Sequence, residues 1–274
     1  MKSIITNKIK FLGAFLIASS FTFAQTAADK KVQAGLTSNL GLNMLKMGTS
    51  KMQSNGVGTN MSIGINLHTS FKNSKNLGIA TGVEFDFGSL KYKPSAPTYY
   101  GYNDTEILSQ SDVDSETPIF QVAERTQKPV FITVPVMFLF RTDFIGDFRY
   151  FGKFGVRNSF LVSQKINDSG TDFPAANSLG AQKDNENMKA SGEMFFYNGS
   201  VGMSAGAEWN FTGSTCLVAE IGYYYGITPM YLDRKEDKKT LFNSDNANPF
   251  TGTRTFFSNK ANLNQLMLKI SILF

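Results

Sequence analysis

Apolar and polar residues alternate along this chain in segment after segment, and this alternation constrains its fold more than any other feature. A period of two is typical of a β-strand, because successive side chains of a strand point to opposite faces. The pattern predicts eight strands, at about 31–44, 59–71, 77–91, 129–142, 149–164, 194–210, 215–230 and 261–274. Each segment is long enough for the roughly 9–11 residues that a tilted transmembrane strand needs.

The residues on the second face of these segments separate a membrane barrel from a soluble sheet. A soluble sandwich or lipocalin would present an extensive face rich in Lys and Glu. Here the second face is mainly small, as in segment 59–71, where Met61 and Ile63 alternate with Ser62 and Gly64. Small residues suit the inside of a narrow barrel, and only a closed barrel leaves no unpaired edge in lipid. We therefore expect an all-β fold, an eight-stranded antiparallel up-and-down transmembrane β-barrel, with a secreted soluble barrel or sandwich as the alternative.

The connections between the predicted strands alternate between short and long. Short connections fall near 71–76, 143–148 and 211–214, and long ones at roughly 45–58, 92–128, 165–193 and 231–260. This alternation is typical of short periplasmic turns and four long extracellular loops, with both chain ends on the periplasmic side.

Aromatic residues near the strand ends predict two girdles at the membrane surfaces. They are Phe71, Phe144, Phe148, Trp209 and Phe211 towards the turns, and Phe196, Tyr197, Tyr223, Tyr224 and Tyr225 towards the loops. Pro135 interrupts segment 129–142 and cannot donate a hydrogen bond to a strand ladder, so we expect a β-bulge at that position.

Residues 1–24 have the pattern of a secretory signal peptide. Three lysines precede an apolar stretch at 11–18, which is too short to span a bilayer as an anchor. Small residues lie just before Gln25. We therefore expect cleavage there, which leaves residues 25–274 as the outer membrane barrel domain.

Charge and cysteine content exclude several function classes. Cleavage would reduce the 27 Lys and Arg residues to 24, against 22 Asp and Glu, so the charge gives no sign of a nucleic-acid partner. The single cysteine rules out an internal disulfide framework.

The acidic run Asp112, Asp114 and Glu116 could bind Ca²⁺, but it lacks the glycine and the ligand spacing of known calcium-binding loops, so we favour a solvated loop. We expect neither a metal nor a cofactor.

An enzyme acting on lipid at the outer leaflet would need a nucleophile beside a base. His68 is the only histidine, and its place in segment 59–71 puts it at the periplasmic end of the strand, facing the lumen. We therefore predict that the protein is not an enzyme.

Charged residues of both signs fall on the face that the alternation turns into the barrel. They are Glu84, Asp86, Glu208 and Glu220, and Arg141, Lys153, Arg157 and Lys269. Because unpaired buried charge is expensive, we interpret them as an ion-pair network that fills a narrow lumen. An ion or proton path is the alternative, although an eight-stranded barrel leaves an interior that side chains nearly fill.

The C-terminal residues alternate up to a terminal aromatic residue and resemble the signal that barrel-assembly machinery recognises. They are Leu268, Ile270, Ile272 and Phe274. The long connection at 92–128 contains tyrosines suited to carbohydrate or protein contact. They are Tyr99, Tyr100 and Tyr102. The expected partners are thus outer membrane lipids, the assembly machinery and other envelope proteins.

In its strand motifs the chain resembles the PorT-like outer membrane β-barrel proteins, over essentially the whole mature sequence. The strongest motif is Phe-Ile-Thr-Val-Pro-Val-Met-Phe-Leu-Phe at 131–140, similar to the family's strand with an apolar-Pro-apolar centre. Residues 150–156, 219–227 and 268–274 look like three later strands of that family. The resemblance implies a barrel and an outer-membrane address in a Gram-negative envelope. The founding member's link to type IX secretion does not follow from these motifs.

Three function classes remain open. The first is a structural or accessory barrel that works with other envelope proteins, with protein secretion as one such role. The second is a surface binding or adhesion protein that uses its extracellular loops. The third is a narrow pore or transporter. We favour the first.

Overall fold

The computed structural model describes residues 31–176, 178–190, 192–212, 215–246 and 248–274. The predicted signal peptide, residues 1–24, lies outside the described residues. Within them the chain is mainly β-structure, and its helical segments are two 3-10 turns, Gln110–Asp112 and Glu236–Lys238. No helix in this part of the chain is long and apolar enough to cross a membrane.

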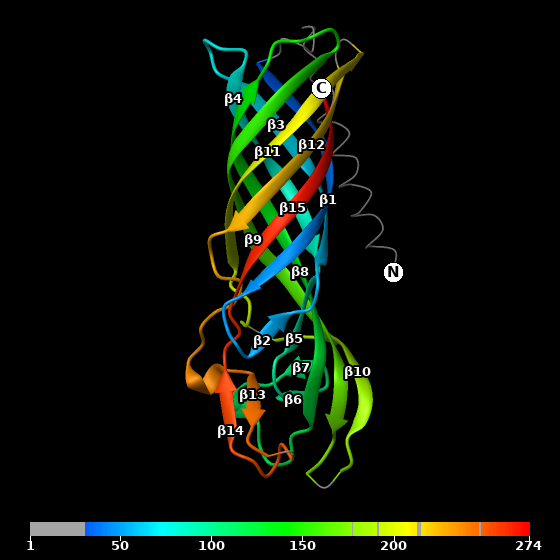
Figure 1. Ribbon diagram of the computed structural model, residues 1–274, viewed down its shortest axis with the longest axis vertical. Helices are drawn as coiled ribbons and strands as arrows, with labels where there is room; N and C mark the ends of the chain where they lie inside the picture. Colours follow the sequence, from blue (N-terminus) through cyan, green and yellow to red (C-terminus); the bar gives the residue numbers. More distant parts are fainter. Residues whose placement is uncertain (1–30, 177, 191, 213–214, 247) are drawn as a thin grey trace, which may run out of the picture.

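Eight long strands of the described chain pair into a closed ring (Figure 1). They are β1 (Val32–Met47), β3 (Gly58–Ser70), β4 (Leu77–Gly88), β8 (Ile119–Arg141), β9 (Phe148–Phe173), β11 (Tyr197–Thr212), β12 (Thr215–Gly226) and β15 (Ala261–Leu273). Each strand pairs antiparallel with the next in this order, and β15 pairs back with β1. Closure gives every ring strand two neighbours, so no sheet edge faces lipid. The predicted antiparallel barrel is confirmed.

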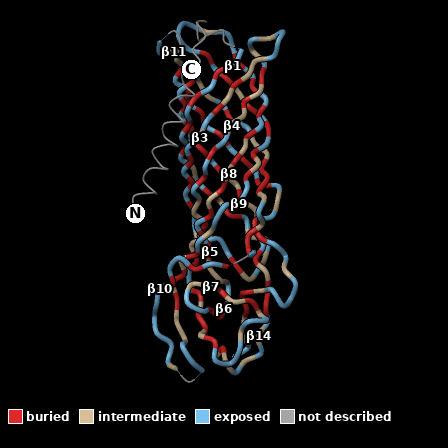
Figure 2. Tube along the Cα trace, turned by 180° about the vertical axis from the view of Figure 1, so that it is seen from behind, coloured by how far each residue is buried: buried red, intermediate tan, exposed pale blue. Residues whose placement is uncertain are grey.

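Large apolar side chains point outward from every ring strand. One exposed example from each strand is Leu40, Ile63, Phe85, Phe138, Phe154, Met203, Ile221 and Leu268. Buried and exposed residues alternate along the barrel wall, as Figure 2 shows. An apolar belt of this extent would be strongly unfavourable in water, at about 25 cal/mol per Å². The belt therefore faces lipid, as the alternation predicted.

The predicted bulge at Pro135 is wrong. Pro135 lies in register opposite Arg157 on β9, and its carbonyl oxygen accepts a hydrogen bond of 2.8 Å from the Thr81 hydroxyl on β4. In an antiparallel strand the backbone N and O atoms of one residue face the same neighbouring strand. The backbone N atom of Pro135, which carries no hydrogen, therefore faces β4. The ladder between β4 and β8 is interrupted at this point. The β8–β9 register shifts instead beyond Val130, where Val162 is the extra residue on β9.

The long connections fold into a compact unit beyond one end of the barrel, and we call this unit the cap. It comprises the described residues of 49–57, 89–128, 165–196 and 228–260. Its strands are β2 (Met52–Ser54), β5 (Leu90–Pro94), β6 (Thr98–Asn103), β7 (Glu106–Ile107), β10 (Ala181–Met188), β13 (Leu241–Ser244) and β14 (Arg254–Phe257), with the extended ends of β8 and β9. Figure 1 shows the cap at the end of the barrel that lies away from the C-terminus. We call this end of the barrel the loop end. The opposite end, with the short connections, is the turn end.

The cap has an apolar core that is continuous with the loop end of the barrel, and burial of this core explains why the cap folds. Its buried residues include Leu90, Tyr92, Tyr100, Phe120, Ile166, Tyr231, Leu241 and Phe257. Each fully buried side chain of this size contributes about 1.5–3 kcal/mol. The connections therefore continue the sheet rather than remaining irregular loops.

Candidate functional site: the charged lumen and the cap

All eight charged residues that the alternation turned inward are buried inside the barrel. They are Glu84, Asp86, Arg141, Lys153, Arg157, Glu208, Glu220 and Lys269. Each belongs to a ring strand and points away from the apolar belt, because the strand period of two separates the two faces.

Arg157 of β9 is the centre of this network. Its Nη1 atom lies 2.7 Å from Glu84 Oε2, and its Nη2 atom lies 3.0 Å from Asp86 Oδ2. The planar guanidinium group has enough donors to serve both carboxylates of β4 at once. On the other side of Glu84, the Nζ atom of Lys269 lies 2.5 Å from Oε1. Both oxygens of Glu84 thus have a cation partner.

Two further groups of ion pairs line the wall from β8 to β12. The Nζ atom of Lys153 lies 2.6 Å from Glu220 Oε2. Glu208 forms an ion pair with Arg141, with 3.0 Å between Nε and Oε1, and its Oε2 atom accepts a hydrogen bond of 2.5 Å from the Nε atom of Arg149. Arg149 was not among the residues predicted from the sequence. Its spacing of four from Lys153, which places both on one strand face, was the signal that would have identified it.

Other contacts tie the walls together across the lumen. The Nη2 atom of Arg141 lies 2.8 Å from His68 Nδ1 on β3. Arg149 donates from Nη2 to Gln33 Oε1 at 3.1 Å. Gln33 is on β1 and Arg149 on β9, and these strands are diametrically placed in the ring of eight. His68 therefore lies at the turn end, as predicted, in contact with a charged group.

Uncharged polar side chains fill the wall formed by β1, β3 and β15. Asn66 donates from Nδ2 to Ser271 Oγ at 3.0 Å, and Ser271 donates on to Thr37 Oγ1 at 2.9 Å. Gln265 donates from Nε2 to Asn43 Oδ1 at 2.9 Å. Hydrogen bonds of this kind offset the cost of burying polar groups.

Tyr224 also lies inside the barrel, so its predicted place in the aromatic girdle is wrong. Its ring centroid is 5.1 Å from the guanidinium carbon of Arg157. Tyr223 and Tyr225 occupy the outward positions of β12 and are exposed. Three consecutive tyrosines in one strand cannot share a face, and the middle one points inward.

A second buried ion-pair cluster lies in the cap. Arg125 of β8 binds Asp168 of β9 through two hydrogen bonds, Nε to Oδ1 at 2.8 Å and Nη2 to Oδ2 at 2.7 Å. Its Nη1 atom lies 3.7 Å from Oε1 of Glu193, whose carboxylate accepts no hydrogen bond from the described residues. Burial raises the pKa of Glu193, although the positive charge of Arg125 opposes this rise. Sequence reasoning missed the cluster because these residues lie in segments expected to be loops.

The tyrosines predicted as loop contacts are buried in the cap, so that prediction is wrong. Tyr99 stacks on Phe242 with 5.7 Å between ring centroids. Tyr100 lies beneath Arg125, and Tyr102 donates its hydroxyl hydrogen to Asp172 Oδ1 at 2.8 Å. The connection that carries them folds as sheet, and its aromatic residues become core.

In the acidic run at 112–116, the carboxylates of Asp112 and Asp114 accept hydrogen bonds from residues of their own loop. Oδ1 of Asp114 accepts hydrogen bonds from the backbone N atoms of Glu116 and Thr117, at 3.0 and 2.7 Å. The hydrogen bond from the Thr117 hydroxyl has the largest effect in lowering the pKa of Asp114, and the two backbone hydrogen bonds lower it further. In the described chain no group of three or more His, Cys, Asp or Glu is arranged to hold a metal ion.

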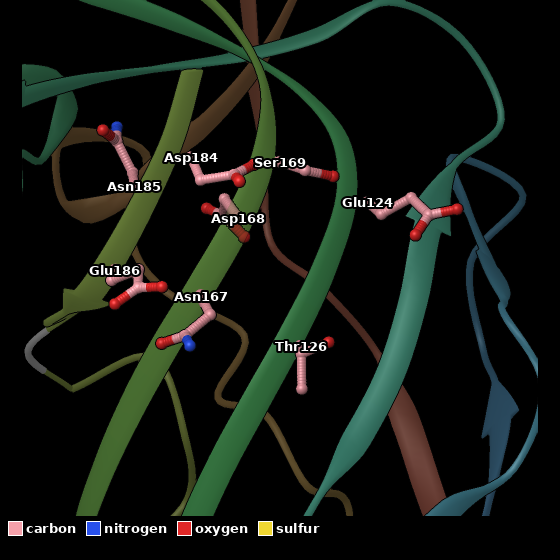
Figure 3. Close-up of a pocket in the computed structure, with 8 residues that line it drawn as sticks. All are labelled: Glu124, Thr126, Asn167, Asp168, Ser169, Asp184, Asn185 and Glu186. Atoms are coloured by element: carbon pink, nitrogen blue, oxygen red, sulfur yellow. The ribbon is translucent and has the colours of Figure 1, made fainter. Parts of the chain in front are cut away.

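An open groove of about 220 Å³ lies on the outer face of the cap (Figure 3). The register aligns Glu124 of β8, Ser169 of β9 and Asp184 of β10 on three neighbouring strands. Asn167 and Glu186 also line the groove. The cap thus presents carboxylate and amide oxygens on a preformed surface.

The residues of the candidate assembly signal are all exposed on the outer face of β15 or directly after it. They are Leu268, Ile270, Ile272 and Phe274. The backbone N atom of Phe274 donates to the carbonyl oxygen of Ala34 at 2.8 Å, so the C-terminus is paired to β1 up to its last residue.

A family model described as an outer membrane protein beta-barrel domain matches residues 23–232. No curated protein matches the sequence. Among solved structures the chain is similar to Neisserial surface protein A (NspA), at 11% identity and a TM-score of 0.36, with 89% of this chain and 96% of that chain covered. The chain is also similar to Ail, the attachment invasion locus protein of Yersinia pestis, at 12% identity and a TM-score of 0.31, with 89% of this chain and 100% of that chain covered. A third similar structure is the outer membrane protein OprG of Pseudomonas aeruginosa, at 10% identity and a TM-score of 0.40, with 91% of this chain and 98% of that chain covered.

Proposed function

This chain belongs to the outer membrane protein beta-barrel domain family, and from that premise we propose that it is a plugged, non-enzymatic barrel with a structural or accessory role alongside partner proteins of the envelope. It is an integral protein of the outer membrane. Within the family we assign it to the PorT-like members, on the strength of the motif at 131–140.

The filled lumen is the single observation that carries this proposal. Each isolated buried charge would cost several kcal/mol, so the carboxylates draw the long cationic side chains across the interior. Contacts such as Arg149 to Gln33 and Lys269 to Glu84 cross between strands that are not neighbours. A narrow lumen occupied in this way supports a structural barrel over a pore or transporter.

The cap supports the part of the proposal that concerns partner proteins. A rigid surface loses less conformational entropy on binding than a set of flexible loops. The cap has a buried core and an ion pair between Arg125 and Asp168 that holds β8 and β9 together beyond the barrel. Its acidic groove would favour a partner segment rich in Lys or Arg.

Surface binding or adhesion is the second candidate, and the same groove favours it. The two candidates differ in the location of the partner, which is another envelope protein in the first and an external molecule in the second.

Co-purification from detergent-solubilised native membranes tests the proposal. We expect a stable stoichiometric partner with the wild-type protein and loss of that partner from a Glu124→Lys/Asp184→Lys variant. Lys72→Glu is the matched control, because Lys72 is an exposed residue of the turn end. Recovery of the barrel alone under mild detergent, together with direct binding of an external ligand to the cap, would replace the first candidate by the second.

A further inference from the structure

Three lysines lie together on the outward face of the wall, just beyond the apolar belt at the loop end. Lys128 of β8 is directly opposite Lys165 of β9 in the ladder. Lys91 of β5 pairs with Thr126, two residues from Lys128 on the same strand face, so Lys91 is a diagonal neighbour of Lys128. All three side chains are exposed. We call them the lysine row.

The lysine row is unfavourable in the isolated protein. Directly opposite residues of an antiparallel pair have Cβ atoms about 4.5–5.5 Å apart, and like charges at that distance repel. None of the three lysines forms an ion pair with any described residue. The arrangement therefore lacks a compensating anion within the described protein.

The depth of the lysine row relative to the membrane suggests where that anion comes from. Lys128 lies two residues beyond Val130, which ends the outward apolar positions of β8. Two residues advance about 7 Å along a strand, or about 5 Å along the membrane normal at a tilt near 45°. The polar headgroup region occupies roughly 5–7 Å on each side of the hydrocarbon core. The lysine row therefore lies among the lipid headgroups.

Acidic residues of β8 and β10 lie farther from the membrane on the same face. Glu124, which pairs with Ser169, lies four residues beyond Lys128 and about 9 Å farther along the normal by the same arithmetic. Asp184 lies next to Ser169 on β10. Glu124 and Asp184 therefore favour an anion held at headgroup depth over an extended acidic molecule that also reaches across the cap.

We propose that the lysine row binds the phosphate groups of a lipid in the outer leaflet of the outer membrane. The ammonium groups would donate hydrogen bonds to the phosphate oxygens, and the apolar belt below Val130 would contact the acyl chains of the same lipid. Lysines that only anchor the barrel at the interface would not need to stand opposite one another. Lys46 of β1 is such a lysine, because it faces Asn262 in the ladder.

Thermal unfolding of the purified full barrel tests this site, with bisphosphorylated lipid A and its dephosphorylated form as probes in the same neutral detergent. We expect the wild-type melting temperature to rise more with the phosphorylated lipid. The Lys128→Gln/Lys165→Gln variant should lose that difference, and Lys128→Arg/Lys165→Arg should keep it. Lys46→Gln, at corresponding depth on β1, should also keep it.

The same variants separate lipid binding from a purely structural role. Without lipid, Lys128→Gln/Lys165→Gln should melt at the wild-type temperature or above it, because the substitution removes a repulsion. A lower lipid-free melting temperature for this variant would overturn the proposal. An equal wild-type response to both lipids, or a full response retained by the glutamine variant, would also overturn it.

Discussion

Lys269 of β15 and Glu84 of β4 meet inside the barrel, with 2.5 Å between Nζ and Oε1, although β1 and β3 separate their strands in the ring. Glu84 also binds Arg157 from the opposite direction. One carboxylate thus joins three parts of the wall through the interior.

Replacement of Arg157 by alanine should strongly destabilise the barrel. The substitution removes the cation partner of Asp86 and one of the two partners of Glu84, which leaves buried negative charge uncompensated. Loss of one member of a buried pair typically costs about 3–5 kcal/mol in the free energy of unfolding. Urea titration in detergent micelles measures this change. Lys260→Ala removes a surface ion pair with Asp233 and should leave the stability nearly unchanged.

Conductance should be absent or small in planar bilayers. Charged side chains cross the lumen of a barrel whose interior has room for little else. We expect no stable channel of general-porin size from the wild-type protein, and Arg157→Ala should change stability more than it changes conductance. A large wild-type channel, or a variant that conducts more at an unchanged melting temperature, would favour the pore.

Membrane integration should appear in extraction and in gel mobility. The outward apolar rows require detergent, so carbonate or high salt should leave the protein in the membrane pellet. A folded barrel should also migrate differently on gels before and after boiling. Recovery of the mature protein in soluble form from the periplasm or medium would contradict this prediction.

Removal of Phe274 should impair assembly. Phe274 is exposed at the end of the outward row of β15, and its backbone N atom pairs with Ala34 of β1 at the seam of the ring. We expect lower outer-membrane levels for both the deletion and Phe274→Asp, and near-normal levels for the conservative Phe274→Tyr. Immunoblots of membrane fractions with heat-modifiability measure the effect. Normal levels in the first two variants would exclude an assembly signal here.

The stability of the cap should fall as pH rises above the ordinary pKa of glutamate. Burial raises the pKa of Glu193 in the folded cap, so the folded state binds this proton more tightly than the unfolded chain does. The charges facing Glu193 are those of Arg125, Asp168 and Arg234. The stabilisation is complete below the unfolded pKa and is lost as pH rises through the raised folded value. Protease susceptibility of the cap, compared at about pH 5 and about pH 8, should increase with pH.

Glu193→Gln provides the control for this pH effect, since glutamine keeps the shape of the side chain and does not titrate. The variant should show a smaller increase in susceptibility between the two pH values. An increase equal to that of the wild type would assign the pH effect to other groups.

The sequence by itself determined the barrel. A period of two shows directly which residues share a strand face, and a face that is apolar on every strand has to meet lipid. The same parity placed Glu84 and Arg157 on inward positions before any contact was known. It failed at Tyr224 only because the aromatic girdle was assigned by residue type instead of by strand face.

Tertiary structure alone decided which charges pair and what the long connections form. Arg157 binds Glu84 and Asp86, and Arg149 binds Gln33, because the curvature and stagger of the closed ring bring these side chains together. No local sequence pattern encodes that curvature or stagger. The cap depends on contacts between segments far apart in the chain, such as Tyr99 with Phe242. Such contacts become favourable only when the barrel has brought both segments to one end, and this is why tyrosines that looked like surface residues form a core.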